Sequence, residues 1–241
     1  MLFRTAAAAL ALVLGSPLAA SAAMIVAVSQ NRSVSASAQV IGGPLVSNSF
    51  SAGDFGVFDQ SAGGISNHPA GPGWYVQSGV RQKSTIGPDS LSAHLQVGFA
   101  APFGTPIGSA QTQSLFDVTF DLLESANFEL GNGKEPSPFG SGLHVVTLRN
   151  ESGQVIAQPG SGYYFPQGSD DLLAWASVVS GVLAPGRYRL TAEWNQGVPA
   201  DPGSLNAAVV MLFTPIPEPG TALLVALGLG ALAARRARTE S

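Results

Sequence analysis

The sequence contains no cysteine and few charged residues. None of its 241 residues is Cys, and 11% are Asp, Glu, Lys or Arg, against about a quarter in an average soluble domain. The absence of cysteine excludes disulfides, thiolate metal sites, a cysteine nucleophile and the acylated cysteine of a bacterial lipoprotein. A folded domain must therefore take its stability from an apolar core, which suits a sheet sandwich better than a small stapled module.

Lysine and arginine are scarce and scattered. The chain has 11 of them against 15 acidic residues, and its formal net charge is −4. Nucleic-acid binding needs clustered Lys and Arg to neutralise phosphates. We therefore expect no nucleic-acid partner.

The sequence also lacks the common catalytic motifs. It has no Gly-x-Ser-x-Gly elbow, Walker loop, dinucleotide-binding glycine motif or His-Glu-x-x-His helix. We predict no catalytic residue, no cofactor and no metal, and a protein that is not an enzyme. His68, His94 and His144 lie in separate segments, so solvent-facing or structural roles are favoured over convergence on a metal ion.

Carboxylates do not form an obvious catalytic pair. Asp117 and Asp121 share one face of a predicted strand, about 13 Å apart, which is too far for glycoside hydrolysis by this pair alone. Asp54 with Asp59, and the pair 170–171, lie in loop-like stretches. These aspartates could help to bind calcium or could be ordinary solvated turn residues. The sequence around them does not match an EF-hand loop, and solvated turns are favoured.

The first 22 residues are typical of a secretory signal peptide. Arg4 supplies the charged start, residues 5–15 are apolar, and Pro17 breaks the run. Ala20 and Ala22 then provide the small residues of a cleavage site. We predict a signal helix that is cleaved after Ala22, because the run is too short to span about 30 Å of hydrocarbon as a retained anchor.

The last residues, 215–241, have three parts in a fixed order. Pro217, Glu218 and Pro219 come first, an apolar run follows at 222–234, and Arg235, Arg236 and Arg238 end the series. The prolines keep the segment extended and accessible to an enzyme. The apolar run predicts a short hydrophobic helix of only about 20 Å, a marginal span. The arginines favour the cytoplasmic side, which places the body on the far side.

This order of parts closely resembles the PEP-CTERM sorting signal of Gram-negative bacteria. The resemblance covers about the last 25 residues, and Gly220 stands where family members more often carry Ser or Ala. It implies an exosortase as processing partner, transient contact with the inner membrane, and a destination at the cell surface or in the extracellular matrix. It also makes exopolysaccharide a candidate partner. A plain, retained tail anchor is the alternative that fits the same hydropathy.

Residues 23–214 are predicted to form an all-β domain, an antiparallel β-sandwich or jelly roll. Residues 116–122 give the clearest strand, because every second residue is apolar and those between are polar. Residues 205–213 are expected to return antiparallel to 187–194, and 63–73 to form a loop. Residues 170–182 fit a helix or a strand equally. Other strands are predicted at 33–41, 55–58, 74–80, 91–99, 128–130, 143–148 and 154–157.

Two divisions of this domain remain open. One sandwich is favoured, and two small β domains divided near residues 102–106 are the alternative.

Aromatic pairs at Trp74-Tyr75 and Tyr163-Tyr164 adjoin Gly and Pro, and we identify them as candidate glycan contacts, because flat rings stack on sugar rings. Trp175 and Trp194 are assigned to the core.

Three functions follow, in order of preference. The first is an exported structural or interaction protein of the cell surface or exopolysaccharide matrix, sorted by its C-terminal signal. The second is a carbohydrate-binding module, and the third is a secreted hydrolase.

Overall fold

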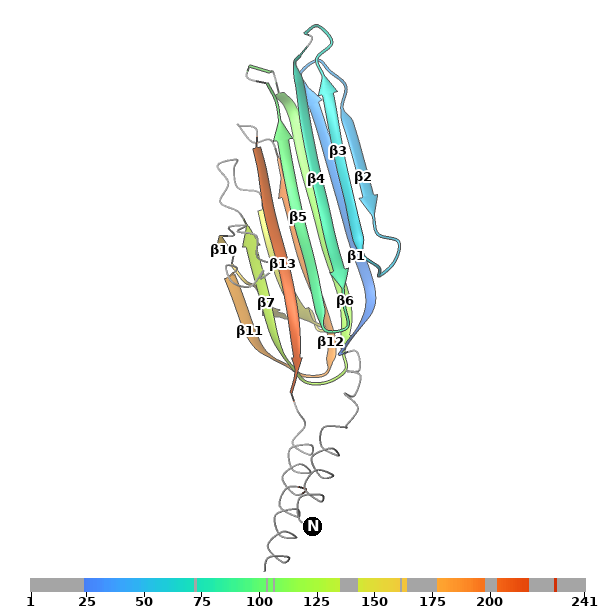
Figure 1. Cartoon of the computed structure of the whole chain (residues 1–241), viewed down its shortest axis with the longest axis vertical. Helices are drawn as coiled ribbons and strands as arrows, with labels where there is room; N and C mark the ends of the chain where they lie inside the picture. The colour runs from blue at the N-terminus through green and yellow to red at the C-terminus, as the bar shows by residue number, and fades with distance from the viewer. Residues whose placement is uncertain are drawn as a thin grey trace, which may run out of the picture.

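The chain folds into two β-sheets that pack face to face (Figure 1). The computed structural model describes residues 24–71, 73–102, 104–105, 107–134, 143–160, 162–163, 177–197, 203–216 and 228. The strands of this part of the chain are β1 (Ile25–Val40), β2 (Val46–Ser51), β3 (Phe58–Asn67), β4 (Tyr75–Ile86), β5 (Ser90–Ala100), β6 (Ile107–Leu122), β7 (Ala126–Lys134), β8 (Leu143–Asn150), β9 (Val155–Ala157), β10 (Gly162–Tyr163), β11 (Ser177–Leu183), β12 (Gly186–Gln196) and β13 (Gly203–Pro215).

The two sheets differ in strand order. Sheet A has the order β2-β1-β6-β12-β8-β9, and sheet B has the order β10-β7-β13-β5-β4-β3, with β11 also paired to β7. All described pairs are antiparallel except β10 with β7. The predicted all-β sandwich is therefore confirmed.

Strands from both halves of the sequence mix in each sheet. In sheet A, β1 pairs with β6 from Ile25 opposite Leu122 to Val40 opposite Ile107. In sheet B, β13 lies between β5 and β7. Residues 102–106 connect a strand of sheet B to a strand of sheet A, so the strands do not divide there into two separate β domains.

In the alternating strands, the apolar side chains point inward and fill the space between the sheets. The apolar residues of 116–122 are all buried, as the sequence predicted, and Phe120 packs edge-on against Phe213 of the opposite sheet at 5.4 Å between ring centres. Trp194 is buried too, as predicted. A second apolar cluster, rich in Ala and Val, lies toward the other end of the strands; it includes Val34, Ala36, Ala38, Val40, Ala62, Val76, Val80 and Val97.

The predicted pairing of residues 205–213 with 187–194 is wrong. β13 pairs with β5 and β7 in sheet B, whereas β12 pairs with β6 and β8 in sheet A. The run from Ala207 to Met211 is buried without interruption. Such continuous burial means that both faces of β13 are covered along this run.

Two predictions in the first half of the chain are also wrong. The strand expected at 55–58 begins only at Phe58, and residues 63–67, expected as loop, complete β3. Gly63 and Gly64 concealed the strand, because glycine is depleted in strands. Gly64 is needed there, since a Cβ atom on it would lie 2.7 Å from the carbonyl oxygen of Val46 in the facing sheet.

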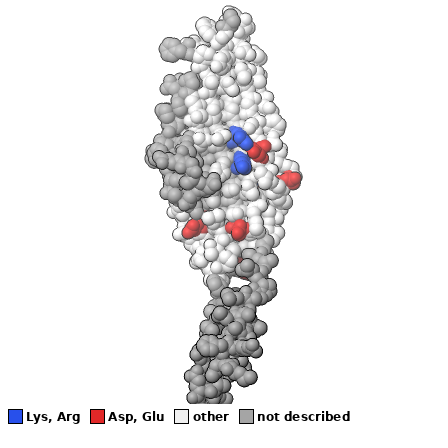
Figure 2. All heavy atoms as spheres, in the orientation of Figure 1, with Lys and Arg blue, Asp and Glu red and all other residues white. Residues whose placement is uncertain are grey.

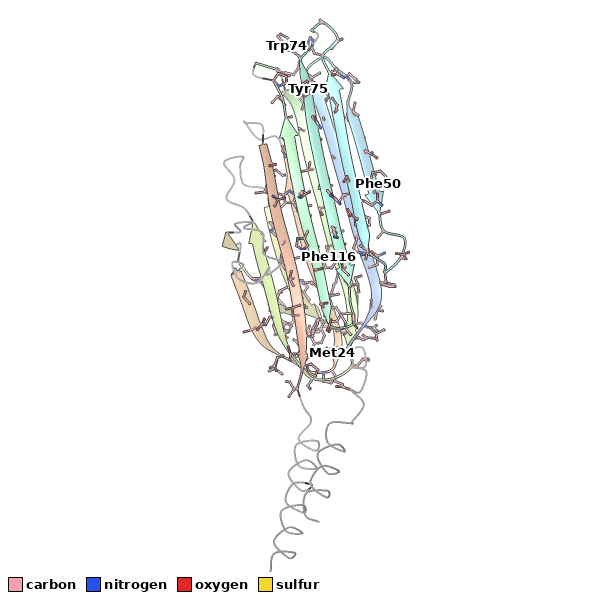
Figure 3. All side chains as sticks on the ribbon, in the orientation of Figure 1. Met24, Phe50, Trp74, Tyr75 and Phe116 are labelled. Carbon is pink, nitrogen blue, oxygen red and sulfur yellow. The ribbon has the colours of Figure 1, made fainter. Side chains whose placement is uncertain are left out.

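The chain enters and leaves the sandwich at the same pole (Figures 1 and 3). Met24 accepts a 2.9 Å hydrogen bond at its carbonyl from Leu123 N–H, and Ile216 N–H donates to the carbonyl of Ser125 at 3.2 Å. We call this end the terminal pole. The opposite end, made by the loops 41–45, 68–74 and 101–105, is the distal pole; residues 72 and 103 are not among those described.

The predicted terminal helices lie outside the described residues, apart from Gly228. Within the described part of the chain, no helix is long and apolar enough to cross a membrane.

Candidate interaction surface

Among the described residues, the half of the sandwich nearer the distal pole carries no formal charge. The stretches 33–53, 60–80 and 90–116 contain no Asp, Glu, Lys or Arg, and they supply the distal parts of β1, β3, β4 and β6 and all of β2 and β5. We call these stretches the neutral half. In Figure 2 the distal part of the visible face shows no coloured atoms, and the acidic and basic residues lie in the middle and toward the terminal pole. Sequence reasoning missed this feature, although the spacing of the charged residues along the chain discloses it.

Hydroxyl and amide groups cover sheet A in the neutral half. A shallow hollow on its outer face crosses β2, β1 and β6 and is lined by Ser35, Ala36, Ser37, Ser47, Asn48, Ser49, Gln111 and Gln113. Their register forms rows across the strands: Ser49 is opposite Ser35, and Ser35 is opposite Gln113. This face can donate and accept hydrogen bonds but offers no charge to an ionic partner.

Sheet B has a second shallow hollow with a different floor. Gly79 is opposite Gly63 on one side and Gly98 on the other, so three neighbouring strands lack a side chain in one row. Gln77 and Gln96 are among the residues around it, with Arg81 and Asn206 at the side toward the terminal pole; the lining is Ser61, Ala62, Gln77, Gly79, Val80, Arg81, Gln96, Val97, Gly98, Phe99, Ala100, Ser204 and Asn206.

The distal pole exposes apolar side chains. Ile41 and Leu45 of the β1–β2 loop are more than half exposed, and Trp74, before β4, is 44% exposed. Trp74 packs edge-on against His68 at 5.4 Å between ring centres. His68 is fixed in turn, because its Nδ1 accepts a hydrogen bond from Ala70 N–H at 3.1 Å. The exposed indole is thus held in place by its own loop.

The structure does not bring the predicted aromatic contacts together. Trp74 and Tyr75 lie at the distal pole (Figure 3). Tyr163 lies in β10, at the opposite edge of sheet B, with β7, β13 and β5 between it and β4. Tyr164 lies outside the described residues. A single aromatic platform built from both pairs is therefore not present in the described part of the chain.

A polar layer separates the two apolar clusters inside the sandwich. Arg32 is fully buried, and its Nη1 lies 3.4 Å from the hydroxyl of Ser84. Gln82 lies in the same layer within hydrogen-bond distance of Ser84 and Ser114. Burial lowers the pKa of the Arg32 guanidinium, and the nearby charge of Asp54 acts in the opposite direction. These groups bond to one another inside the protein, so they do not form a surface site.

The two carboxylates on β6 are occupied by arginines of the neighbouring β12. Asp117 binds Arg189 through two hydrogen bonds of 2.6 and 2.7 Å, and Asp121 binds Arg187 through bonds of 2.8 and 3.0 Å. The Arg187 guanidinium lowers the pKa of Asp121. Both carboxylates lie on the outer face of sheet A in ion pairs, an arrangement typical of a solvated sheet surface rather than of an acid–base pair.

The other acidic candidates and the histidines are dispersed. Asp59 is bound by Arg81 at 2.8 Å, and the pair 170–171 lies outside the described residues. His94 lies on β5 in sheet B, and His144 lies on β8 in sheet A beside Trp194. Within the described part of the chain, no group of three His, Asp or Glu side chains could hold a metal ion.

The residues of the two predicted processing segments lie outside the described part of the chain. These are Ala20 and Ala22 at the signal cleavage site, Pro217, Glu218 and Pro219 of the sorting motif, and Arg235, Arg236 and Arg238. The remaining core candidate, Trp175, lies outside it as well.

Comparisons with known proteins add little to this description. No protein-family model and no curated protein sequence matches the chain. Among solved structures, the chain is similar to the GH31 alpha-xylosidase Xac1773 from Xanthomonas citri, with 9% identity and a TM-score of 0.21. The match covers 70% of this chain and 26% of that one. A likeness of this size carries no argument about the activity of this protein.

Proposed function

We propose that this protein is an exported structural or interaction protein of the cell surface or exopolysaccharide matrix of a Gram-negative bacterium, sorted by its C-terminal segment. The observation that carries the proposal is the common pole of the two chain ends. The segment before Met24 and the segment after Ile216 both leave the sandwich at the terminal pole, beside residues 123–125. A membrane attached to either end would therefore meet the same pole.

This placement determines which surface faces away. The neutral half lies at the far end of the strands from Met24 (Figure 3). While the C-terminal segment is in the membrane, that half points outward, and after processing the whole sandwich is released. The arrangement supports a protein that presents an uncharged surface to its surroundings.

The chemistry of that surface suggests the class of partner. Serine, asparagine and glutamine side chains offer hydrogen bonds without charge. Contacts through such groups depend little on ionic strength, because salt screens charges rather than neutral hydrogen bonds. We therefore propose a neutral, hydroxyl-rich or amide-rich partner rather than an ionic one.

Processing can be tested in the native host by intact mass and cell fractionation. We expect the recovered protein to begin after Ala22 and to end near Pro217-Glu218-Pro219. Replacing these three residues with alanine is expected to leave the tail in place and to shift the protein to the membrane fraction. Thr214→Ala, on an exposed position just before the motif, is the matched control and should be processed normally. A surface-located protein that retains Ser241 would refute sorting by cleavage.

Carbohydrate binding is the second candidate function, and the exposure of Trp74 favours it. Its indole is 44% exposed beside a charge-free loop, and such a ring can stack on the apolar face of a sugar. We expect retention of the full chain on a polysaccharide affinity gel to fall about tenfold in Trp74→Ala, in line with about 1–3 kcal/mol for a stacking contact. Phe50→Ala, an exposed aromatic away from this pole, is the matched control. Equal retention of the two variants, or no retention on any glycan tested, would refute this function.

A further inference from the structure

The outermost strand of sheet A, β2, is an unprotected edge. Within the described part of the chain it pairs with β1 on one side only. All its residues from Ser47 to Ser51 are exposed, and Val46 is partly buried. Edge strands are usually protected from pairing with other chains by lysine, proline, a bulge or a covering segment. β2 contains no proline and no charged residue, and the nearest charges in sequence are Arg32 and Asp54.

The other described edges differ from this one. β3 carries Asp59, which binds Arg81 on the adjacent strand. β9 has only three residues, of which Val155 is opposite Arg149. β11 is uncharged, like β2, but it directly follows residues outside the described part of the chain. β2 is therefore the best-defined open edge, and β11 is its natural comparison.

Phe50 is an apolar side chain at this edge that a partner strand could cover. It is opposite Val34, whose side chain is buried in the core, so Phe50 belongs to the inward-facing series of β2. The Phe50 ring is nevertheless 39% exposed, because β2 has no neighbour beyond it. Two further apolar side chains, Phe55 and Val57, are exposed in the loop that follows β2. Figure 3 shows Phe50 on the outer strand of the sandwich.

We propose that the protein pairs with a second copy of itself through β2, antiparallel, so that two six-stranded sheets join into one. A two-fold axis perpendicular to the sheet keeps outward residues opposite outward residues. With the axis at Asn48, Val46 of each copy is opposite Phe50 of the other, which forms an aromatic–β-branched pair. Ser47 is then opposite Ser49.

The lack of charge makes β2 compatible with its own copy. Like charges directly opposite each other destabilise a strand pair, and identical copies would meet that problem at every charged residue near the axis. The stretch 33–53 contains none. The terminal pole, where the described chain begins at Met24 and leaves the sandwich at Ile216, lies away from β2 (Figure 1). This inference goes beyond the proposed function and does not rest on processing of the tail.

The absence of cysteine makes the pairing directly testable in the full chain. Asn48→Cys and Ser49→Cys are prepared separately in detergent and oxidised mildly, and dimers are measured on a non-reducing gel. A residue on the axis meets its counterpart within the Cα separation of about 4.4–6.8 Å that a disulfide requires, whereas a residue one position from the axis lies about 7–8 Å from its counterpart. We therefore expect Asn48→Cys to form a covalent dimer and Ser49→Cys to form one less readily. Ser180→Cys on β11 and Ser61→Cys on β3 are matched controls and should stay monomeric.

A second variant tests whether the edge itself makes the contact. Adding Ser49→Lys to Asn48→Cys, or Asn48→Lys to Ser49→Cys, places two lysines near the axis and should reduce the dimer by up to about fivefold. Ser92→Lys, on sheet B, should leave it unchanged, and thermal unfolding verifies that each variant is folded. Cross-linking of Ser180→Cys as strong as that of the β2 variants would indicate crowding in the micelle and would overturn the proposal. No dimer from either β2 cysteine, or a dimer insensitive to lysine, would overturn it as well. None of these outcomes depends on where the tail is cut.

Discussion

Arg32 donates a 2.6 Å hydrogen bond from Nη2 to the carbonyl oxygen of Asp54, which ties the interior of the sandwich to the loop after β2. The same guanidinium lies 5.7 Å from the centre of the Phe58 ring and forms no ion pair with a carboxylate among the described residues. Its other hydrogen bonds go to Gln30 and Ser84. The buried charge of Arg32 is thus stabilised by neutral oxygens and one aromatic face. These hydrogen bonds fix the positions of the groups that accept them.

Replacing Arg32 tests this arrangement. We expect Arg32→Ala to lower the free energy of unfolding by about 2–4 kcal/mol, because it creates a cavity and leaves buried acceptors without their donor. Urea unfolding of the full chain measures the change. Arg149→Ala is the control: its guanidinium bonds to the Gly153 carbonyl on the surface, and its loss should stay within about 0.5 kcal/mol. An equal loss from both variants would contradict a structural role for the buried guanidinium.

Gly64 sets how closely the two sheets approach. A Cβ atom there would lie 2.7 Å from the Val46 carbonyl oxygen and 3.5 Å from Ala38 N, and backbone atoms cannot move aside cheaply. We expect Gly64→Ala to destabilise the protein by about 1–3 kcal/mol through overpacking. Gly98, also in a strand and with no atom within 4 Å of its Cβ position, is the matched control. Thermal unfolding should show Gly98→Ala unchanged or slightly more stable, and equal destabilisation of both variants would contradict a specific clash.

The fold could be predicted from the sequence where the alternation of residues is strong. Residues 116–122 predict a strand clearly, because large apolar and polar side chains alternate without a break. The hairpin of β8 and β9 around residues 150–153 follows from its turn residues, and Gly153 has the positive φ of 82° that such a turn requires. The proposals of export and sorting rest on the sequence alone.

The remaining features depend on contacts between distant residues. Pairing of β13 with β5 instead of β12 is not encoded in either strand by itself, since all three are apolar on the inner side. β3 was hidden because Gly64 is required by the close approach of the facing sheet, not by its own strand. The uncharged stretches of the neutral half are visible in the sequence, but their position together at one end of the sandwich depends on the fold.

Ser66 of β3 in sheet B joins the two sheets at the end of β1 in sheet A. Its buried hydroxyl accepts a hydrogen bond from Val40 N–H at 3.1 Å and donates one to the Pro44 carbonyl at 2.7 Å. Ser66→Ala leaves a buried N–H without a partner, which costs about 1–3 kcal/mol. Urea unfolding should show that loss, whereas Ser61→Ala, at an exposed position on the same strand, should have little effect. A Ser66→Ala protein as stable as the wild type would mean that water replaces the hydroxyl.

Acid sensitivity should follow the surface ion pairs. Hydrogen bonds from Arg81 and Arg187 lower the pKa values of Asp59 and Asp121 below their ordinary range. Stabilisation from a lowered pKa is complete above the ordinary value and is lost as the pH falls through the folded-state value. We therefore expect the melting temperature to decline as the pH is taken from about 5 to about 2, and to decline less in the double variant Asp59→Asn, Asp121→Asn.

The effect should be modest, because both carboxylates are exposed and water screens their partners. Asp89→Asn is the control, since that carboxylate accepts a hydrogen bond from Ser90 rather than from an arginine. Added salt should reduce the difference between the wild type and the double variant, because exposed ion pairs weaken with ionic strength. An identical decline in the two proteins would show that acid acts elsewhere in the molecule, and a melting temperature that falls mainly above pH 5 would point to groups other than these aspartates.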